Sequence, residues 1–245
     1  MGKSFTKTKM LTDTPQHYCP GCTHGIIHRL VAEALEELGV MDKSVVVVPV
    51  GCSVLAYHYF NCDGIEAAHG RAPAVATGVK RVHPDQVVFT YQGDGDLASI
   101  GTAERIHVAA RNENITTIFV NNAIFGMTGG QMAPTTLTGQ VTTTSPYGRV
   151  GLNESEPIKV CELMSTIEGP AYIARVSVHD PKHIIQAKKA IKKAFEYQIN
   201  KKGYTLIEIL STCPSNWKLS PLDSIKWLKE NMIPAFPLGV YKEVE

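Results

Sequence analysis

The stretch Val87-Val88-Phe89-Thr90-Tyr91-Gln92-Gly93-Asp94-Gly95-Asp96 decides the fold of this chain. Its apolar first half predicts a buried strand, and the glycines fall where that strand ends. Residues 115–120 predict a second buried strand, which ends at Asn121-Asn122. Because ligands of an open parallel sheet bind beyond the carboxyl ends of its strands, we expect Asp94 and Asn122 to face the same space. One carboxylate and one amide oxygen suit a hard cation such as Mg²⁺ that also binds phosphate oxygens.

Segments typical of strands alternate with segments typical of helices along the chain. Continuous apolar runs predict strands buried on both faces of a parallel sheet, and apolar residues at helical spacing predict the intervening helices. The alternation predicts one α/β domain, residues 1–245, with a single doubly wound, mostly parallel sheet flanked by helices. We expect strands at 44–50, 87–91, 115–120, 171–178 and 204–210, helices at 21–38, 71–82, 101–111, 158–167, 181–200 and 221–230, an N-terminal arm at 1–18 and a C-terminal tail at about 233–245.

Composition narrows the class of protein. The chain has 245 residues, of which 44% are hydrophobic and 19% charged, as is usual for a globular protein. A formal net charge of +1 argues against nucleic acid as the main partner. There is no apolar run long enough to suggest a membrane span, and residues 1–10 lack an apolar signal segment. We therefore expect a cytoplasmic protein whose six cysteines are reduced thiols or metal ligands.

Residues 123–149 are rich in Gly, Thr, Ser and Pro and show no periodicity. A loop of this length inside a compact domain is usually functional. Glycine N–H groups can approach phosphate oxygens closely because no Cβ intervenes. The candidates for binding a diphosphate are Gly93, Gly95, Gly126, Gly129 and Gly130, with the hydroxyl of Thr128 as a further donor.

The cysteines offer a second possible site. Cys19-Pro20-Gly21-Cys22 has the spacing that places two sulfurs on one metal, and it precedes a predicted helix. Cys52 and Cys213 each follow a predicted strand, so we expect them at the same edge of the sheet as Asp94. Three interpretations compete for this pattern. A thioredoxin-like redox pair would normally follow a strand, and no predicted strand precedes the motif. A structural zinc site and an iron–sulfur cluster each need four ligands. Cys62 and Cys161 are interpreted as structural.

His69 and Arg71 precede the predicted helix 71–82 and are candidate catalytic residues. Arginine is suited to bidentate recognition of carboxylate or phosphate, and histidine can transfer protons near neutral pH. The alternatives are an interface salt bridge for Arg71 and a hydrogen-bonded loop position for His69.

Taken together, these motifs resemble those of the thiamine-diphosphate-binding (beta) subunits of 2-oxoacid:ferredoxin oxidoreductases. The resemblance rests on Cys19–Cys22, Gly51-Cys52-Ser53, His69-Gly70-Arg71-Ala72, Gly93–Asp96 and Gly126–Gln131. It implies that thiamine diphosphate is anchored by Mg²⁺, with Asp94, Asn122 and the carbonyl of Ile124 as ligands. It also implies a [4Fe–4S] cluster held by Cys19, Cys22, Cys52 and Cys213. The cofactor-binding residues that it implies are Cys52, Ser53, Gly93, Asp94, Gly95, Asp96, Asn122, Ile124, Gly126, Met127 and Thr128.

The same resemblance implies oxidative decarboxylation of a 2-oxoacid to acyl-coenzyme A and CO₂, with the electrons passing through the cluster to ferredoxin. It implies an alpha subunit that supplies the pyrimidine-binding domain, together with gamma and ferredoxin-like delta subunits or domains, so the chain alone is expected to be inactive. Met127 replaces an asparagine of some pyruvate-cleaving relatives, which favours a branched-chain 2-oxoacid or 2-oxoglutarate as substrate. A non-oxidative thiamine-dependent decarboxylase or synthase subunit and a zinc-stabilised scaffold are the alternatives.

Overall fold

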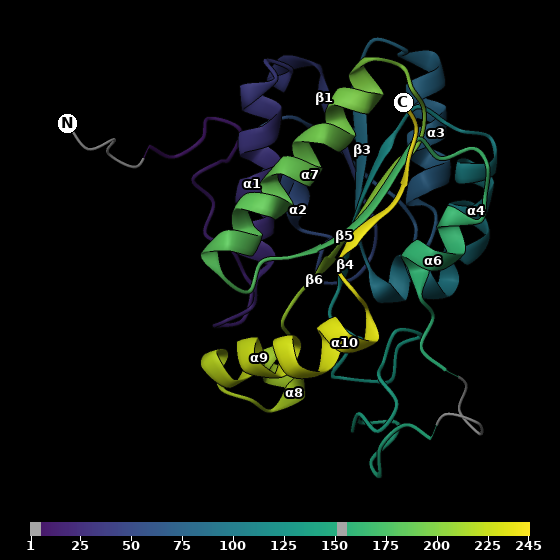
Figure 1. The fold of residues 1–245 in the computed structure, drawn as a ribbon. Coiled ribbons are helices and arrows are strands. Elements are labelled where there is room, and N and C mark those ends of the chain that lie inside the picture. The colour runs from purple at the N-terminus through teal and green to yellow at the C-terminus, as the bar shows by residue number, and fades with distance from the viewer. Residues whose placement is uncertain (1–5, 151–155) are drawn as a thin grey trace.

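The computed structural model describes residues 6–150 and 156–245. Within these ranges, strands form one sheet in the order β2-β1-β3-β4-β6-β5-β7 (Figure 1). The strands pair in parallel except β7, which runs antiparallel to β5. Their bounds are β1 Ser44–Val48, β2 Asp63–Glu66, β3 Val87–Gly93, β4 Thr116–Asn121, β5 Tyr172–Ser177, β6 Thr205–Leu210 and β7 Gly239–Glu243.

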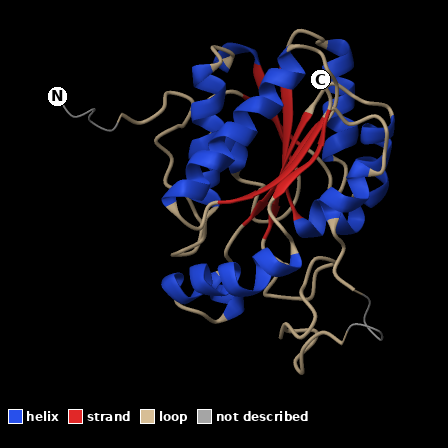
Figure 2. Ribbon diagram, in the orientation of Figure 1, coloured by secondary structure: helices blue, strands red, loops and turns tan. Residues whose placement is uncertain are grey.

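Helices cover both faces of the sheet, as Figure 2 shows. On one face α1 and α7 pack together and share a core with the strands, and on the other face α3, α4 and α6 enclose a second core. This arrangement confirms the predicted doubly wound α/β fold. The helices are α1 His24–Glu37, α2 Ala56–Tyr59, α3 Ala72–Val82, α4 Thr102–Ala110, α6 Val160–Ser165 and α7 Pro181–Ile199, and the shorter turns are η1 Met41–Lys43 and the π-helical η2 Gly95–Ile100.

Local sequence explains where the long helices begin and end. The carboxylate of Asp180 accepts a 2.8 Å hydrogen bond from the backbone of His183, which caps the N-terminus of α7, and Pro181 occupies the first turn. After α1 the chain turns at Gly39, where φ is +67°, a value that glycine adopts without a Cβ penalty. Each of these signals can be read in the sequence.

A third layer lies beyond the carboxyl ends of the central strands (Figure 1). It consists of α8 Pro214–Trp217, α9 Pro221–Trp227, η3 Leu228–Met232 and α10 Ile233–Ala235. Apolar side chains of this layer pack on Ala123, Leu137 and Leu210. At Gly21, where φ is +82°, a Cβ would lie 2.6 Å from Cβ of Pro221, so only glycine permits this close approach to α9.

Two strands escaped the sequence analysis. Residues 233–245 were predicted as a tail, but they form α10 and the edge strand β7. The short strand β2 was also missed. Both lie at sheet edges and are largely exposed, so neither shows the continuous apolar run of a central strand. Among the described residues, there is no helix that combines the length and the apolar character needed to span a membrane.

Candidate functional site

Four neighbouring strands deliver the predicted site residues to one edge of the sheet. The strands β1, β3, β4 and β6 are adjacent and parallel, so their carboxyl ends lie side by side. Cys52, Asp94, Asn122 and Cys213 follow these strands in that order. The topology therefore brings together residues from widely separated parts of the sequence.

Three oxygen atoms converge at the ends of β3 and β4. The side-chain oxygen of Asn122 lies 2.7 Å from the carbonyl oxygen of Ile124 and 3.1 Å from Oδ2 of Asp94. Neighbouring oxygens around an octahedral Mg²⁺ lie about 2.9 Å apart, since the metal–oxygen distance is about 2.05 Å. The same amide oxygen accepts a hydrogen bond from the backbone of Ile124 at 3.3 Å, which fits its orientation. A cation between these three oxygens would remove their mutual repulsion. Without a cation, the Asn122 amide would have to rotate so that its nitrogen donates to the oxygens of Ile124 and Asp94.

Asp94 is buried and held by the surrounding backbone. Its carboxylate accepts hydrogen bonds from the backbone of Gly95 at 2.9 Å and of Ile124 at 3.0 Å, and from the hydroxyl of Thr135 at 3.0 Å. Burial nevertheless raises the pKa of Asp94 to about 7, because the hydrogen bonds only partly offset the loss of water. A divalent cation would stabilise the ionised form that burial disfavours.

A cavity of about 350 Å³ opens beside these oxygens. Most of the predicted cofactor-binding residues line it, namely Cys52, Ser53, Gly93, Asp94, Gly95, Asp96, Asn122, Gly126, Met127 and Thr128. The hydroxyl of Ser53 is buried in its wall and has no hydrogen-bond partner. A buried hydroxyl without a partner is costly, so it fits a polar ligand in this cavity. Gly129 and Gly130 do not line the cavity, although they were candidates for binding the diphosphate.

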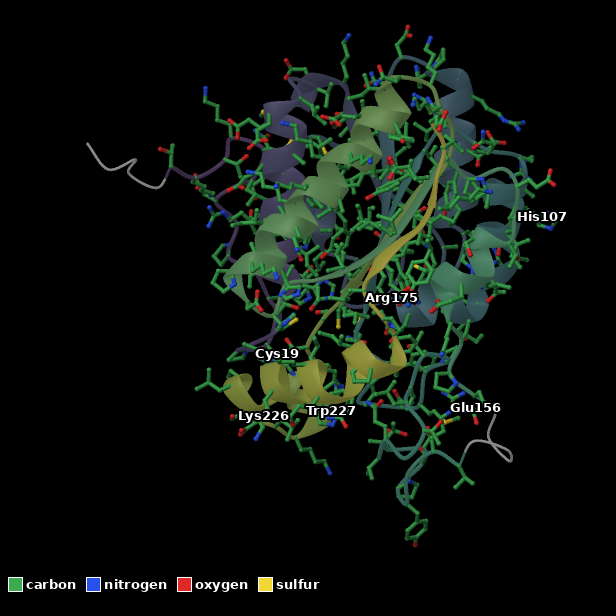
Figure 3. All side chains as sticks on the ribbon, in the orientation of Figure 1. Cys19, His107, Glu156, Arg175, Lys226 and Trp227 are labelled. Atoms are coloured by element: carbon green, nitrogen blue, oxygen red, sulfur yellow. The ribbon has the colours of Figure 1, made fainter. Side chains whose placement is uncertain are left out.

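The four predicted thiols line a second, smaller cavity of about 60 Å³. Cys19, Cys22, Cys52 and Cys213 all contribute to its wall. Cys19, labelled in Figure 3, lies two residues before Gly21, which packs against Pro221 of α9. The two cavities adjoin, because His24, Cys52, Asn122 and Gly126 line both of them.

The spacing of the thiols separates the metal alternatives. Sulfurs around one tetrahedral zinc lie about 3.8 Å apart, given a Zn–S distance of 2.3 Å. In the described part of the chain, no three of these sulfurs lie within 4.8 Å of one another. This wider spacing suits a multi-iron cluster better than zinc. Burial raises the pKa of Cys22 and of Cys52 to about 12, so binding a metal would have to drive their ionisation.

The glycine and amide around the thiols fit a buried group. A Cβ on Gly126 would lie 3.3 Å from the sulfur of Cys52 and 3.5 Å from that of Cys213, so the missing side chain leaves room between them. The amide of Asn216 donates to the sulfur of Cys213 at 3.3 Å and to the carbonyl of Gly126 at 2.8 Å. Hydrogen bonds to cysteine sulfurs are one means by which proteins tune iron–sulfur clusters.

His24 is a functional candidate that the sequence analysis does not identify. It is buried, it lines both cavities, and its Nδ1 lies 2.8 Å from the hydroxyl of Tyr91. Burial lowers the pKa of His24 to about 3, which keeps the ring neutral. Its position two residues after Cys22 is the signal in the sequence that could have identified it.

The structure separates the two predicted catalytic residues. His69 lines the larger cavity, and its Nδ1 lies 2.8 Å from Oδ1 of the buried Asp96. Asp96 also accepts from the backbone of Gly70 and from Gln92, so its oxygens are used within the protein. Arg71 does not line the cavity and forms a 2.6 Å ion pair with Glu104. This ion pair lies within the chain, whereas the alternative interpretation of Arg71 was a salt bridge at an interface.

Comparisons with known proteins agree with this geometry. The family profile described as "Thiamine pyrophosphate enzyme, C-terminal TPP binding domain" matches residues 49–209. The chain is 50% identical over 230 residues to the ketoisovalerate oxidoreductase subunit VorA of Methanothermobacter thermautotrophicus, a match that covers 94% of this chain and 48% of that protein. It is 40% identical to the 2-oxoglutarate synthase subunit KorB of Methanocaldococcus jannaschii, which covers 89% of this chain and 79% of that protein.

A solved structure matches the whole fold. It is the 2-oxoglutarate:ferredoxin oxidoreductase of Magnetococcus marinus, with 2-oxoglutarate, coenzyme A and succinyl-CoA bound. The TM-score is 0.84 and the identity 27%, over 99% of this chain and 86% of that one. The chain spans about half the length of the VorA relatives. From the profile, the relatives and the sheet-edge site together, the chain belongs to the thiamine-diphosphate-binding beta subunits of the 2-oxoacid:ferredoxin oxidoreductase family.

Proposed function

We propose that this chain is the beta subunit of an enzyme that oxidatively decarboxylates a branched-chain 2-oxoacid to its coenzyme A thioester. The observation that carries the proposal is the shared wall of the two cavities, which places four thiols next to the three oxygens of Asp94, Asn122 and Ile124. A non-oxidative thiamine enzyme needs the oxygens but has no use for the thiols.

Thiamine diphosphate, when bound, supplies the electron sink for loss of CO₂, and a [4Fe–4S] cluster supplies a one-electron acceptor. The chain's own residues bind and orient these groups. Asp94, Asn122 and the Ile124 carbonyl would hold Mg²⁺, and Ser53 would donate its free hydroxyl into the cavity. Cys19, Cys22, Cys52 and Cys213 would hold the cluster, and neutral His24 would close the wall between the two groups.

The substrate proposal rests on the wall of the larger cavity. Val50, Ile100, Phe125 and Met127 give it apolar surface, and among the described residues there is no Lys or Arg in its lining. The second carboxylate of 2-oxoglutarate would need a positive partner, which this wall does not offer. The 50% identity to two ketoisovalerate oxidoreductase subunits points in the same direction. The 2-oxoglutarate synthase subunits among the relatives make 2-oxoglutarate the second candidate.

Partner chains complete the proposed enzyme. Thiamine enzymes need a pyrimidine-binding domain, and residues 6–150 and 156–245 form one α/β sheet, whose edge the diphosphate-type site occupies. We therefore propose an alpha subunit that supplies this domain, with gamma and ferredoxin-like delta subunits or domains passing electrons to ferredoxin. The cytoplasmic location stays a prediction.

The experiment is reconstitution of the complex under anaerobic conditions. Reduction of ferredoxin would be followed with coenzyme A and a panel of 3-methyl-2-oxobutanoate, 2-oxoglutarate and pyruvate. We expect the highest kcat/KM with the branched-chain acid and no turnover by this chain alone. Coenzyme A-independent release of an aldehyde, with no ferredoxin reduction, would contradict the proposal.

A further inference from the structure

The Ile124 carbonyl, the third oxygen of the proposed cation site, depends on an unusual backbone turn at the preceding residue. Ala123 has a φ of +57°, in the left-handed region that residues with a Cβ rarely adopt. This conformation is strained for a residue other than glycine, because the Cβ approaches the following carbonyl oxygen. Ala123 is fully buried, so water does not compensate for the strain. Other contacts must hold the turn.

Asn121 makes the contact that holds it. Its Oδ1 accepts a 3.0 Å hydrogen bond from the backbone N–H of Ala123, and its Nδ2 donates to Oε1 of Glu208 at 2.8 Å. Both residues are fully buried. The carboxylate of Glu208 accepts only, so it fixes which end of the Asn121 amide faces Ala123. The hydroxyl of Thr136 donates to the carbonyl of Ala123 at 2.7 Å and holds the other side of the turn.

Glu208 is held in turn by a buried cation. Its Oε2 lies 2.9 Å from Nε of Arg175. Neither atom forms a well-aligned hydrogen bond, so the contact between them is an ion pair. The sheet register places Glu208 between Arg175 on β5 and Phe119 on β4, so Asn121, two residues further along β4, lies on the same face. Figure 3 shows Arg175 in the interior beside the strands.

Asn121, Glu208 and Arg175 form a row of buried polar residues, and residues of α6 and of the edge strand β7 hold Arg175 at its far end. The guanidinium of Arg175 contacts both oxygens of Glu162 on α6, at 2.9 and 2.6 Å, and the hydroxyl of Tyr241 on β7. The guanidinium of Arg175 therefore pairs with two carboxylates, those of Glu162 and Glu208. The guanidinium of Arg105, which is also buried and adds to the positive field at Glu208, has no hydrogen-bond partner. The side chain of Glu208 is therefore held by protein groups alone, without any ligand in the site.

We propose that Asn121 and Glu208 are positioning residues for the cation site, acting through the left-handed turn at Ala123 to aim the Ile124 carbonyl. Neither residue lines the cofactor cavity. The inference rests on the proposed function in one respect, because it takes Asp94, Asn122 and Ile124 as the cation ligands. It adds a row of buried polar residues across β4, β6 and β5 that governs the geometry of one ligand.

The test measures metal affinity on the complex reconstituted from the partner subunits and the full chain, unaltered or variant. Mn²⁺ serves as a paramagnetic probe of the Mg²⁺ site, and EPR quantifies free Mn²⁺ with thiamine diphosphate at saturation. We expect Asn121→Ala to weaken Mn²⁺ binding about 10- to 100-fold, as is typical when a residue that orients a metal ligand is lost. Glu208→Gln keeps the side chain's shape but removes its charge, and we expect a smaller loss of affinity in the same direction.

A rescue variant distinguishes a lost orientation of the Ile124 carbonyl from general damage to the fold. Glycine adopts the left-handed conformation without a Cβ penalty, so Ala123→Gly in the Asn121→Ala background should recover about fivefold of the lost affinity. Gln198→Ala is the matched control. Gln198 is equally buried and donates to the carbonyl of Val88 at 2.6 Å, away from the site. It should lower the urea midpoint without changing Mn²⁺ affinity.

The outcomes separate the two proposals. If the unaltered chain binds no Mn²⁺ with thiamine diphosphate, or if Asp94→Asn leaves binding intact, the proposed cation site itself is wrong. If Asp94→Asn abolishes binding but folded Asn121→Ala and Glu208→Gln both bind within twofold of the unaltered chain, only the positioning role is overturned. Should Asn121→Ala not fold, Glu208→Gln decides by the same criterion.

Discussion

The sulfurs of Cys52 and Cys213 flank a single glycine, Gly126, although the two cysteines follow different strands far apart in the sequence. A methyl group at Gly126 would stand between them. The backbone of Gly126 does not have the positive φ that demands glycine, so an alanine there is compatible with the fold. The space between the two thiols, and not the backbone conformation, therefore explains why this residue is glycine.

Gly126→Ala is accordingly expected to fold normally but to bind less iron. The added Cβ would lie 3.3 Å from one sulfur and 3.5 Å from the other, closer than a cluster between them would allow. Iron and sulfide analysis after anaerobic reconstitution, together with circular dichroism, measures both properties. Gly78→Ala is a suitable control, since a Cβ at Gly78 meets nothing within 4 Å. Equal iron content in both variants would contradict the expectation.

Cys213→Ser should damage the cluster although Cys213 lies far along the chain from Cys19. The serine hydroxyl keeps the size of the side chain but is a poor iron ligand. We expect the EPR signal of the reduced cluster to be lost or changed, with thiamine diphosphate still bound. Cys161→Ser, in a buried position away from the thiol cavity, provides the comparison. An unaltered four-iron spectrum for Cys213→Ser would remove this residue from the ligand set.

The affinity for Mg²⁺ is expected to depend on pH through Asp94. Burial raises the pKa of this carboxyl to about 7, so a proton competes with the cation below that pH. Affinity should fall up to about tenfold for each pH unit below 7 and level off above it. Titration calorimetry at several pH values, with thiamine diphosphate present, measures this. A flat profile between pH 5 and 8 would be inconsistent with Asp94 as a ligand.

The stability of the metal-free chain should show the opposite trend. The pKa of Asp94 is higher in the folded chain than its ordinary value of 3.8, so folding favours the protonated form. The stability linked to this proton is fully present below pH 3.8 and is lost as the pH rises through about 7. We expect the Asp94 contribution to the free energy of unfolding to be smaller at pH 8 than at pH 6. Asp94→Asn should remove that part of the difference in urea titrations.

Arg71→Ala should leave turnover of the reconstituted complex within about twofold of the unaltered enzyme. Its ion pair with Glu104 lies outside the cavity, and a partly exposed pair near the surface contributes about 1 kcal/mol. His69→Ala, by contrast, removes a side chain from the cavity wall and frees one oxygen of Asp96. We expect it to reduce turnover. A large loss with Arg71→Ala alone would restore Arg71 as a catalytic candidate.

The sequence predicted those parts of the fold and site whose signals are local. The buried runs at 87–91 and 115–120, and the polar residues directly after them, predicted the strands and the convergence of Asp94 with Asn122. The edge strands β2 and β7 escaped because exposed strands carry no continuous apolar run. The partnership of Asn121 with Glu208 could not be predicted, since it depends on β4 and β6 being neighbours in the sheet. The ion pair of Arg71 likewise depends on how α3 packs against α4.

The position of β6 in the sheet also bears on the order of biosynthesis. This strand inserts between β4 and β5 and only then delivers Cys213 to the other thiols. Gly21 meanwhile packs against Pro221, so the segment that carries the first cysteine pair lies against α9. A ribosome must therefore release the chain through Cys213 and Pro221 before all four sulfurs can meet in this arrangement. Iron and sulfide would have to be delivered after these residues have emerged, with the thiols kept reduced until then.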